Sequence, residues 1–250
     1  MGLATMNPPT LCIIGGCNGV GKTTFSRELL PALGIKRFLN ADEIAKGLSP
    51  LDPSLVAFRA GRLLLEEVET LVKARASFAI ESTLSGRTYL ALIRRLRESG
   101  YRFVLHYLTV PSPAQAIQRV SLRVELGGHH VPDADVERRF TRSHRHFLED
   151  YLPLADEWHL WNNVQPPSVE VANSLQDTPE TARQWFNEMH LMETPPRTIL
   201  EQTRIGLEAH QRATAKMLDL YQRMGIPVTP EMTRAPAPEP KASKAAAVRK

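Results

Sequence analysis

A glycine-rich segment near the N-terminus has the residue types and spacing of a phosphate-binding loop, matching the pattern G-x-x-x-x-G-K-[ST]. Glycines let successive backbone N–H groups point at phosphate oxygens. The lysine, Lys22, can bridge the β- and γ-phosphates, and the Thr23 hydroxyl can bind Mg²⁺. We therefore expect a site for ATP and Mg²⁺, with Thr23 as the metal ligand. The expected nucleotide-binding residues are Gly16, Cys17, Asn18, Gly19, Val20, Gly21, Lys22, Thr23 and Thr24.

Two carboxylates lie at the ends of predicted strands: Asp42 follows the second strand, in the run NADEI, and Glu81 ends the third, in the run EST. A kinase needs a carboxylate that orients or deprotonates the acceptor hydroxyl. Ligands of open α/β sheets bind beyond the carboxyl ends of the strands, which is where both residues are expected. Asp42 is equally well placed to cap the helix that follows it, so both roles stay open. Glu81 needs a partner or a ligand, and contact with Mg²⁺ through water is the main alternative to contact with the acceptor.

Arginines are dense between residues 119 and 145, and a Gly127-Gly128 pair separates two basic predicted helices there. A glycine break between basic helices is typical of a lid that closes over phosphates and excludes water. A solvated basic face explains any one of these arginines, but phosphate contact explains the cluster better. The arginines concerned are Arg119, Arg123, Arg138, Arg139, Arg142 and Arg145.

The elements that must position these residues alternate between short apolar runs and amphipathic segments. This alternation predicts an α/β fold with a parallel sheet covered by helices on both faces. Asp52 followed by Pro53 is typical of a helix start. We expect strands at 10–15, 37–40, 77–81, 102–108 and near 169–172. We expect helices at 22–33, at 43–48 after Asp42, and at 52–73, 89–99, 114–126, 135–148 and 178–191.

The chain of 250 residues divides into three predicted parts. Residues 1–194 form the kinase-like domain with its arginine-rich lid, 195–225 a C-terminal amphipathic helix, and 226–250 a basic tail rich in Pro, Ala and Lys that we expect to be disordered. The net charge of +4 comes largely from this tail. We therefore expect no nucleic acid partner for the folded domain.

Composition and targeting signals indicate a cytoplasmic protein. The 42% hydrophobic and 23% charged residues are ordinary for a soluble globular chain, and no apolar run approaches the roughly 20 residues that span a membrane. No basic segment precedes the first apolar stretch, so it does not resemble a secretory signal. The two cysteines, Cys12 and Cys17, provide no disulfide framework.

Several blocks together resemble the zeta toxin family of P-loop kinases. They are G-x-N-G-x-G-K-T-T, N-A-D-E-I-A, A-G-R-L-L, S-F-A-I-E-S-T-L-S-G, R-V-x-x-R-V-x-x-G-G-H-x-V-P and Y-x-P-L-A-D-x-W, and they run from about Leu11 to Asn163. The N-A-D, E-S-T-L-S-G and G-G-H-x-V-P blocks are the specific ones.

The resemblance implies a P-loop kinase fold, ATP and Mg²⁺, and phosphorylation of the 3′-hydroxyl of UDP-N-acetylglucosamine or a similar small-molecule acceptor. It implies that Asp42 is the catalytic base and that Glu81 and Thr83 contact the acceptor. It also implies that lid arginines contact the phosphates, and a protein antitoxin as partner. Our choices for the catalytic lid arginines are Arg123, Arg139 and Arg142, with Arg62 as a further acceptor-site candidate.

Two other functions fit the same residues. One is a P-loop kinase for a nucleoside, an antibiotic or a polynucleotide end. The other is a regulatory module that binds ATP without any acceptor, although the pair Asp42 and Glu81 argues against it, because a switch does not need both carboxylates.

Overall fold

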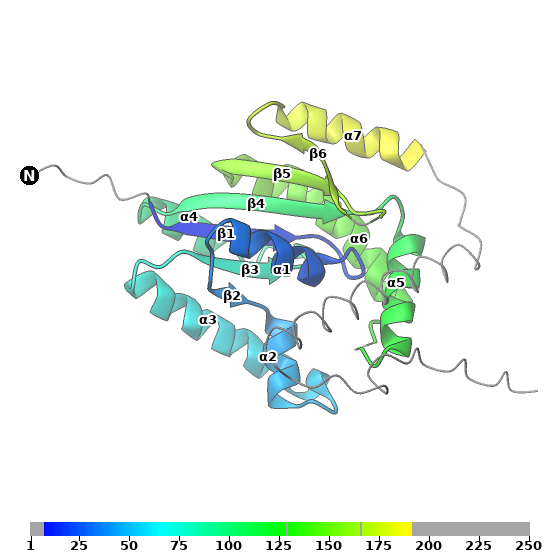
Figure 1. Cartoon of the computed structure of the whole chain (residues 1–250), viewed down its shortest axis with the longest axis horizontal. Helices are drawn as coiled ribbons and strands as arrows, with labels where there is room; N and C mark the ends of the chain where they lie inside the picture. Colours follow the sequence, from blue (N-terminus) through cyan, green and yellow to red (C-terminus); the bar gives the residue numbers. More distant parts are fainter. Residues whose placement is uncertain (1–7, 129, 166, 192–250) are drawn as a thin grey trace, which may run out of the picture. The chain divides into compact units, whose positions relative to one another are not determined.

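The computed structural model describes residues 8–128, 130–165 and 167–191, and a six-stranded sheet lies at its centre (Figure 1). The strands are β1 (Thr10–Gly15), β2 (Phe38–Leu39), β3 (Phe78–Ser82), β4 (Arg102–Thr109), β5 (Glu157–Asn162) and β6 (Val169–Asn173). Their order in the sheet is β2-β3-β1-β4-β5-β6. The neighbours from β2 to β5 pair in parallel, and β6 pairs antiparallel with β5.

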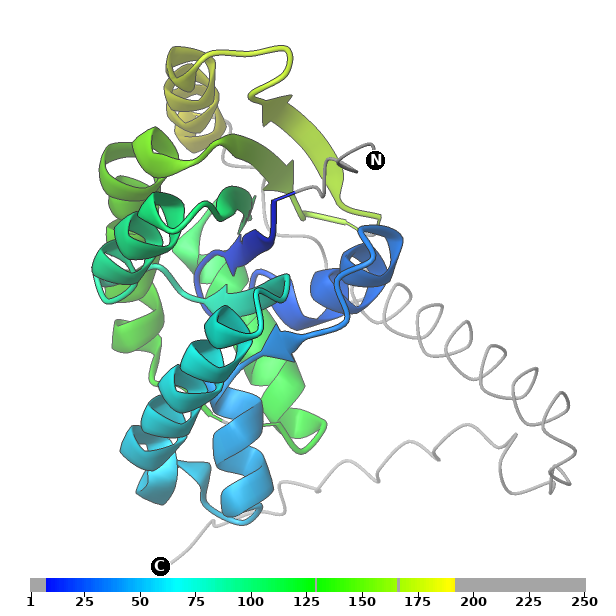
Figure 2. The same ribbon diagram turned by 90° about the vertical axis from the view of Figure 1, so that its left-hand side faces the viewer.

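Helices cover both faces of this sheet (Figures 1 and 2). The helical segments are α1 (Lys22–Ala32), α2 (Ala41–Leu48), the 3₁₀ turn η1 (Pro53–Val56), α3 (Ala57–Lys73), α4 (Leu90–Glu98), α5 (Pro113–Glu125), α6 (Asp133–His146), the π-helical turn η2 (Phe147–Tyr151), the 3₁₀ turn η3 (Leu152–Leu154) and α7 (Pro179–Leu191).

The side chains of β1 point alternately to the two faces of the sheet and belong to two separate layers of the core. Leu11 and Ile13 pack with buried residues of α3, α4 and α7, whereas Cys12 and Ile14 pack with those of α1, α5 and α6. Successive side chains of a strand point to opposite faces, so a buried parallel strand must be apolar on both. The predicted α/β fold with helices on both faces is therefore confirmed.

Several details differ from the sequence expectation. The strand β5 was not expected, and β6 makes the sheet mixed rather than wholly parallel. The Asp52 side chain accepts a hydrogen bond from the Ser54 N–H, as a cap should, but the turn that it starts is the 3₁₀ turn η1 and α3 begins only at Ala57. The helix expected to run to 148 gives way after His146 to the π turn η2.

The expected helix at 195–225 and the expected tail at 226–250 lie outside the described residues. Among the described helices, none combines the length and the apolar character that a membrane crossing would require.

Candidate active site

The phosphate-binding loop connects β1 to α1 at the carboxyl end of the sheet, as its motif predicts. Gly16 and Gly19 have φ of 139° and 83°, a region that favours glycine. A Cβ at Gly19 would stand 2.2 Å from the carbonyl oxygen of Ala116 on α5, so this position also lacks room for any side chain. The loop is therefore held in its curved form by close packing. Thr24, the last expected nucleotide-binding residue, is exposed on α1.

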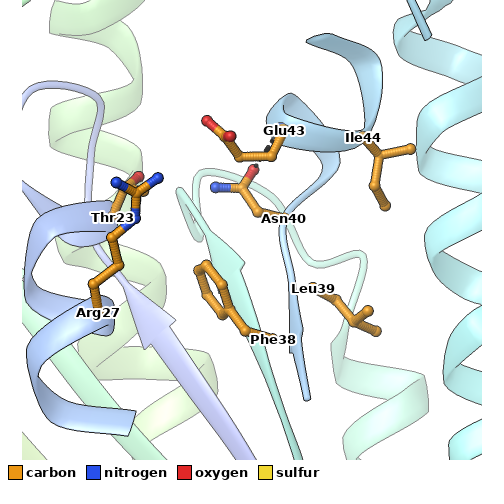
Figure 3. Close-up of a pocket in the computed structure, with 7 residues that line it drawn as sticks. All are labelled: Thr23, Arg27, Phe38, Leu39, Asn40, Glu43 and Ile44. Atoms are coloured by element: carbon orange, nitrogen blue, oxygen red, sulfur yellow. Dashed lines mark hydrogen bonds between the residues drawn. The ribbon is translucent and has the colours of Figure 1, made fainter. Parts of the chain in front are cut away.

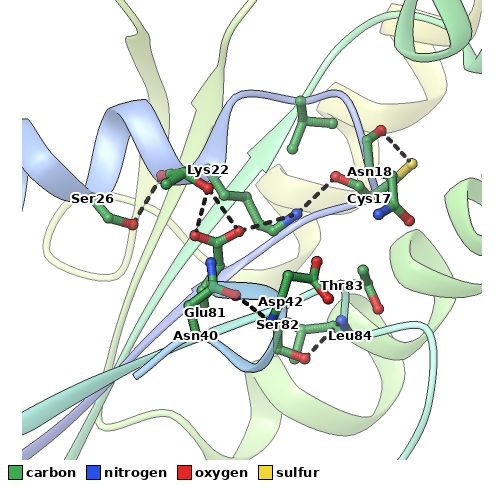
Figure 4. A network of polar contacts seen from close by, with 12 residues as sticks. Cys17, Asn18, Lys22, Ser26, Asn40, Asp42, Glu81, Ser82, Thr83 and Leu84 are labelled. Carbon is green, nitrogen blue, oxygen red and sulfur yellow. Dashed lines mark hydrogen bonds and ion pairs between the residues drawn. The ribbon is translucent and has the colours of Figure 1, made fainter. Parts of the chain in front are cut away.

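Lys22, Thr23 and Glu81 form a buried polar cluster below this loop (Figure 4). The Thr23 hydroxyl lies 3.1 and 2.9 Å from the two carboxylate oxygens of Glu81, and the Lys22 ammonium lies 3.9 Å from the nearer one. Lys22 also donates a hydrogen bond of 3.0 Å to the Cys17 carbonyl. The side chains of Lys22 and Glu81 are only 8% and 9% exposed, so each charge depends on the other.

In the first turn of α2 a residue other than Asp42 caps the helix, so the Asp42 carboxylate is available for chemistry. Asn40 is the N-cap, and its side-chain oxygen accepts hydrogen bonds from the N–H groups of Asp42 and Glu43 at 2.8 and 3.3 Å. The interpretation of Asp42 as the cap was therefore wrong. Its carboxylate is exposed and makes no hydrogen bond or ion pair within the described part of the chain. The pKa of Tyr89 is raised, first by burial and second by the negative charge of Asp42.

Thr83 follows β3 and begins a turn that Figure 4 shows beside Asp42 and Glu81. Its hydroxyl lies 2.9 Å from that of Ser85, and its side chain is partly buried. The two carboxylates and the threonine that the sequence singled out thus come from α2 and from β3 and its end, as expected of residues that follow neighbouring strands.

The predicted arginines do not all reach this cluster. Arg139 donates a hydrogen bond of 3.0 Å to the side-chain oxygen of Asn18 in the phosphate loop and also lies 3.8 Å from Asp135. Arg123 on α5 and Arg142 on α6 are exposed. Arg62 is exposed on α3, where its guanidinium lies 5.9 Å from the centre of the Phe58 ring. Among these arginines, Arg139 thus has a direct hydrogen bond to the phosphate loop.

An unexpected residue, Asn163, supports the loop from the other side. Its side-chain NH₂ donates a hydrogen bond of 2.7 Å to the Val20 carbonyl, and its oxygen accepts one from Ser168 at 2.9 Å. Asn163 directly follows β5, a strand that was not expected from the sequence. Its place beside the loop was missed together with that strand. The signal that could have revealed β5 is the alternation of its side chains, in which Trp158 and Leu160 are buried and their neighbours are partly exposed.

Cys17 is buried within the loop, and burial raises the pKa of its thiol to about 11. Lys22 and Arg139 oppose this effect without overcoming it. The thiol is therefore protonated at neutral pH and is not a nucleophile.

A pocket of about 350 Å³ lies next to Thr23, between α1 and the segment formed by β2 and α2 (Figure 3). Its volume is at the lower end of the range for small-molecule sites. The lining combines apolar and polar side chains: Thr23, Arg27, Phe38, Leu39, Asn40, Glu43 and Ile44.

Known proteins are similar to this chain in sequence or in fold. Residues 11–145 match the family model described as an AAA domain. A protein of Haemophilus influenzae described as uncharacterized is 30% identical over 125 residues, which cover 50% of this chain and 88% of that protein.

Two solved structures extend the similarity at lower identity. A chain of the PezAT chromosomal toxin–antitoxin system of Streptococcus pneumoniae has a TM-score of 0.58 at 17% identity, over 83% of this chain and 88% of that chain. The AvrRxo1-ORF1:AvrRxo1-ORF2 complex with sulphate ions has a TM-score of 0.57 at 18% identity, over 76% of this chain and 66% of that chain. The latter complex has also been solved with ATP. The fold of this chain is shared with the chains of these two structures, and the chain belongs to the AAA domain family.

Proposed function

We propose that this protein is a kinase that transfers the γ-phosphoryl group of ATP to an alcohol group of a small molecule. The observation that carries the proposal is the division of labour between two carboxylates. Glu81 pairs with Lys22 and Thr23 of the phosphate loop, while Asp42 stands exposed nearby with its helix capped by Asn40 instead. One carboxylate serves the phosphates and the other serves the acceptor, as phosphoryl transfer requires.

The residues present fit Mg²⁺ at the loop. The Thr23 hydroxyl already lies within hydrogen-bond distance of both Glu81 carboxylate oxygens. Together these groups offer the hard oxygen ligands that Mg²⁺ prefers. We find no group of three or more His, Cys, Asp or Glu in the described residues that could hold a metal, which agrees with an ion held mostly by water and substrate phosphates. Bound there, Mg²⁺ would neutralise phosphate charge. We thus assign Glu81 to the phosphate side rather than to the acceptor.

The proposed reaction uses groups of this chain in sequence. The Asp42 carboxylate accepts the proton of the acceptor hydroxyl as the oxygen attacks the γ-phosphorus. The bond to the β–γ bridging oxygen breaks and ADP leaves. Lys22 and the loop N–H groups hold the phosphates, and Arg139, joined on closure by Arg123 and Arg142, balances the charge that develops.

We propose a nucleotide sugar, UDP-N-acetylglucosamine or a close analogue, as the acceptor, with Thr83 contacting it and Arg62 at the margin of the site. The motif resemblance supports this choice. We further propose cytoplasmic action and a protein antitoxin as partner, since one similar structure comes from a toxin–antitoxin system. In this proposal residues 1–194 form the kinase domain, and 195–225 and 226–250 form a helix and a tail.

The test is a transfer assay with Mg²⁺, ATP and UDP-N-acetylglucosamine, read by mass spectrometry of the sugar nucleotide. The unmodified protein should form a product that is one phosphate heavier, and Asp42→Asn should lower the rate by about 10²–10⁴-fold, the usual contribution of a general base. Asp133→Asn is the matched control, because Asp133 is likewise exposed in the first turn of a helix. Asp42→Asn should bind ATP normally; a variant that keeps most of its rate would remove Asp42 from the reaction.

A further inference from the structure

The turn that follows β3 holds a strained residue. Leu84 has φ of 51°, although it is not glycine, and its side chain is 1% exposed. A Cβ at Gly15, the residue before the phosphate loop, would stand 2.4 Å from the Leu84 side chain. Such a backbone conformation is costly and persists only where the surrounding structure enforces it. Something must therefore hold this turn in place.

Two side chains of α6 hold the first half of the turn. The Ser143 hydroxyl donates a hydrogen bond of 2.6 Å to the Thr83 carbonyl. The His146 Nδ1 lies 3.2 Å from the Leu84 carbonyl, and since a carbonyl can only accept, Nδ1 carries the proton. Ser143 is completely buried and His146 is 4% exposed, so water does not compete for either bond.

The π turn η2 holds the second half. The Tyr151 hydroxyl donates a hydrogen bond of 2.7 Å to the Gly86 carbonyl, and Asp150 pairs with Arg87 at 2.9 Å. In a π-helical turn the backbone hydrogen bonds join residue i+5 to residue i, as the bond from the Leu152 N–H to the Phe147 carbonyl does here. Both Tyr151 and Asp150 of this turn therefore contact the segment that follows β3.

The same helix reaches the phosphate loop through Arg139, which donates to Asn18 at 3.0 Å. The helix α6 thus contacts the phosphate loop from its middle, through Arg139, and the turn that carries Thr83 from its last residues, Ser143 and His146. An exposed basic helix explains Arg142 and Arg145, but it does not explain three buried donors aimed at three carbonyls of one turn.

We propose that Ser143, His146 and Tyr151 are positioning residues: they clamp the Thr83–Gly86 turn so that Thr83 is presented to the acceptor in fixed register with the phosphate loop. This inference rests on the proposed function, because it assigns the turn to acceptor binding. The clamp acts through the backbone carbonyls of the turn and touches neither the nucleotide nor the reacting atoms.

Tyr151→Phe tests the clamp by deleting a single hydroxyl. Tyr101→Phe is the matched control, because the Tyr101 hydroxyl also donates to a backbone carbonyl, that of Ala76 at 3.1 Å, and Tyr101 is also buried, just before β4. The first readout is amide hydrogen exchange of full-length protein over residues 83–88. Loss of the bond should speed exchange there by about fivefold in Tyr151→Phe, with no change there in Tyr101→Phe. Unchanged exchange in Tyr151→Phe would overturn the clamp.

The second readout is kinetic, with UDP-N-acetylglucosamine as the probe. Tyr151→Phe should lower kcat/KM for this acceptor by about fivefold or more while the KM for ATP stays within about twofold. Tyr101→Phe should change neither. If kcat/KM fell equally for ATP and for the acceptor, or fell equally in both variants, the hydroxyl would serve stability alone. Either result would overturn the positioning role.

A second pair of variants guards against a folding defect. His146→Leu removes the donor to the Leu84 carbonyl and should resemble Tyr151→Phe in both readouts. His146→Asn keeps a short-chain N–H donor and should restore most of the acceptor kcat/KM. Failure of His146→Asn to do better than His146→Leu would count against the clamp. If the unmodified protein forms no product, the nucleotide-sugar acceptor falls, while hydrogen exchange alone still sustains or overturns the clamp.

Discussion

Glu81 is the counter-charge of the phosphate loop, and Glu81→Gln should reveal this in the absence of nucleotide. The substitution keeps the size of the side chain and an acceptor for Thr23, but it leaves the Lys22 ammonium without its carboxylate. At 3.9 Å and an effective dielectric constant of about 20, the lost attraction is about 4 kcal/mol. Breaking a buried ion pair typically costs about 3–5 kcal/mol.

The measurement is the free energy of unfolding in urea, with the melting temperature alongside, in nucleotide-free buffer. For a domain of this size the expected loss corresponds to a decrease in Tm of about 6–20 °C. Glu69→Gln is the control, because the pair of Glu69 with Arg95 has side chains 46% and 50% exposed and should contribute less than about 1 kcal/mol. If Glu81→Gln were no more destabilising than Glu69→Gln, the charge-compensation argument would be refuted.

The same variant should change how metal controls nucleotide binding. Without Mg²⁺, the Glu81 carboxylate lies where it repels the phosphates, so removing its charge should tighten the binding of metal-free ATP. With Mg²⁺, the variant lacks an oxygen that holds the ion and its water. Titration calorimetry should therefore show a smaller gain in ATP affinity from Mg²⁺ in Glu81→Gln than in the unmodified protein; an unchanged gain would place the metal elsewhere.

Three further predictions follow from other contacts. Asn163→Ala removes the donor to the Val20 carbonyl and should weaken ATP binding by about fivefold to tenfold, measured by calorimetry. Gly19→Ala should abolish ATP binding in a folded protein, because its Cβ would collide with the Ala116 carbonyl at 2.2 Å. Burial, aided by His159, lowers the pKa of His106 to about 3, so the unfolded chain binds a proton below pH 6.5 that the folded chain does not, and stability is lost as the pH falls. Between pH 7 and pH 5 this group should contribute a loss of about 2 kcal/mol in urea unfolding, absent in His106→Asn.

The last two of these predictions each have a control. Gly34→Ala imposes the same backbone cost, with φ of 69°, but its Cβ would meet nothing within 4 Å, so ATP binding should be unchanged. His106→Asn keeps an acceptor for the Trp161 indole N–H, which now bonds to Nδ1 at 3.2 Å. Equal pH slopes in this variant and the unmodified protein would show that other groups carry the acid sensitivity.

The phosphate loop could be predicted because all its chemistry lies in one contiguous run with a strand before and a helix after. For the cap of α2 the sequence leaves two candidates, since Asn40 is as good a capping residue as Asp42. Local sequence offers both, and only the observed helix start at Ala41 decides between them. What depends on neighbouring residues was thus largely visible in the sequence.

Contacts between residues that lie far apart in the sequence could not be predicted from it. Asn163 lies 143 residues from Val20, and Ser143 lies 60 residues from Thr83, so no local pattern links them. The strand β5 was missed because two of its positions are the charged or polar Glu157 and His159. These residues are half buried, and they pair with each other at 2.8 Å and with Arg102 and Glu170 of the neighbouring strands. Such pairing is a property of the assembled sheet, and composition alone reads these residues as exposed.

The pleat of β3 explains why one short segment can serve both phosphates and acceptor. Ile80 belongs to the core layer under α3 and α4, and Ala79 to the layer under α1. Glu81 has the parity of Ala79, and it pairs in register with Ile14, so its carboxylate must point toward α1 and the phosphate loop. The chain then turns at Thr83, away from the loop. A shift of one residue would bury the Glu81 charge in the opposite apolar layer without Lys22, at a cost comparable with the whole stability of a domain. The register of β3 is therefore fixed by the same ion pair that prepares the loop for nucleotide.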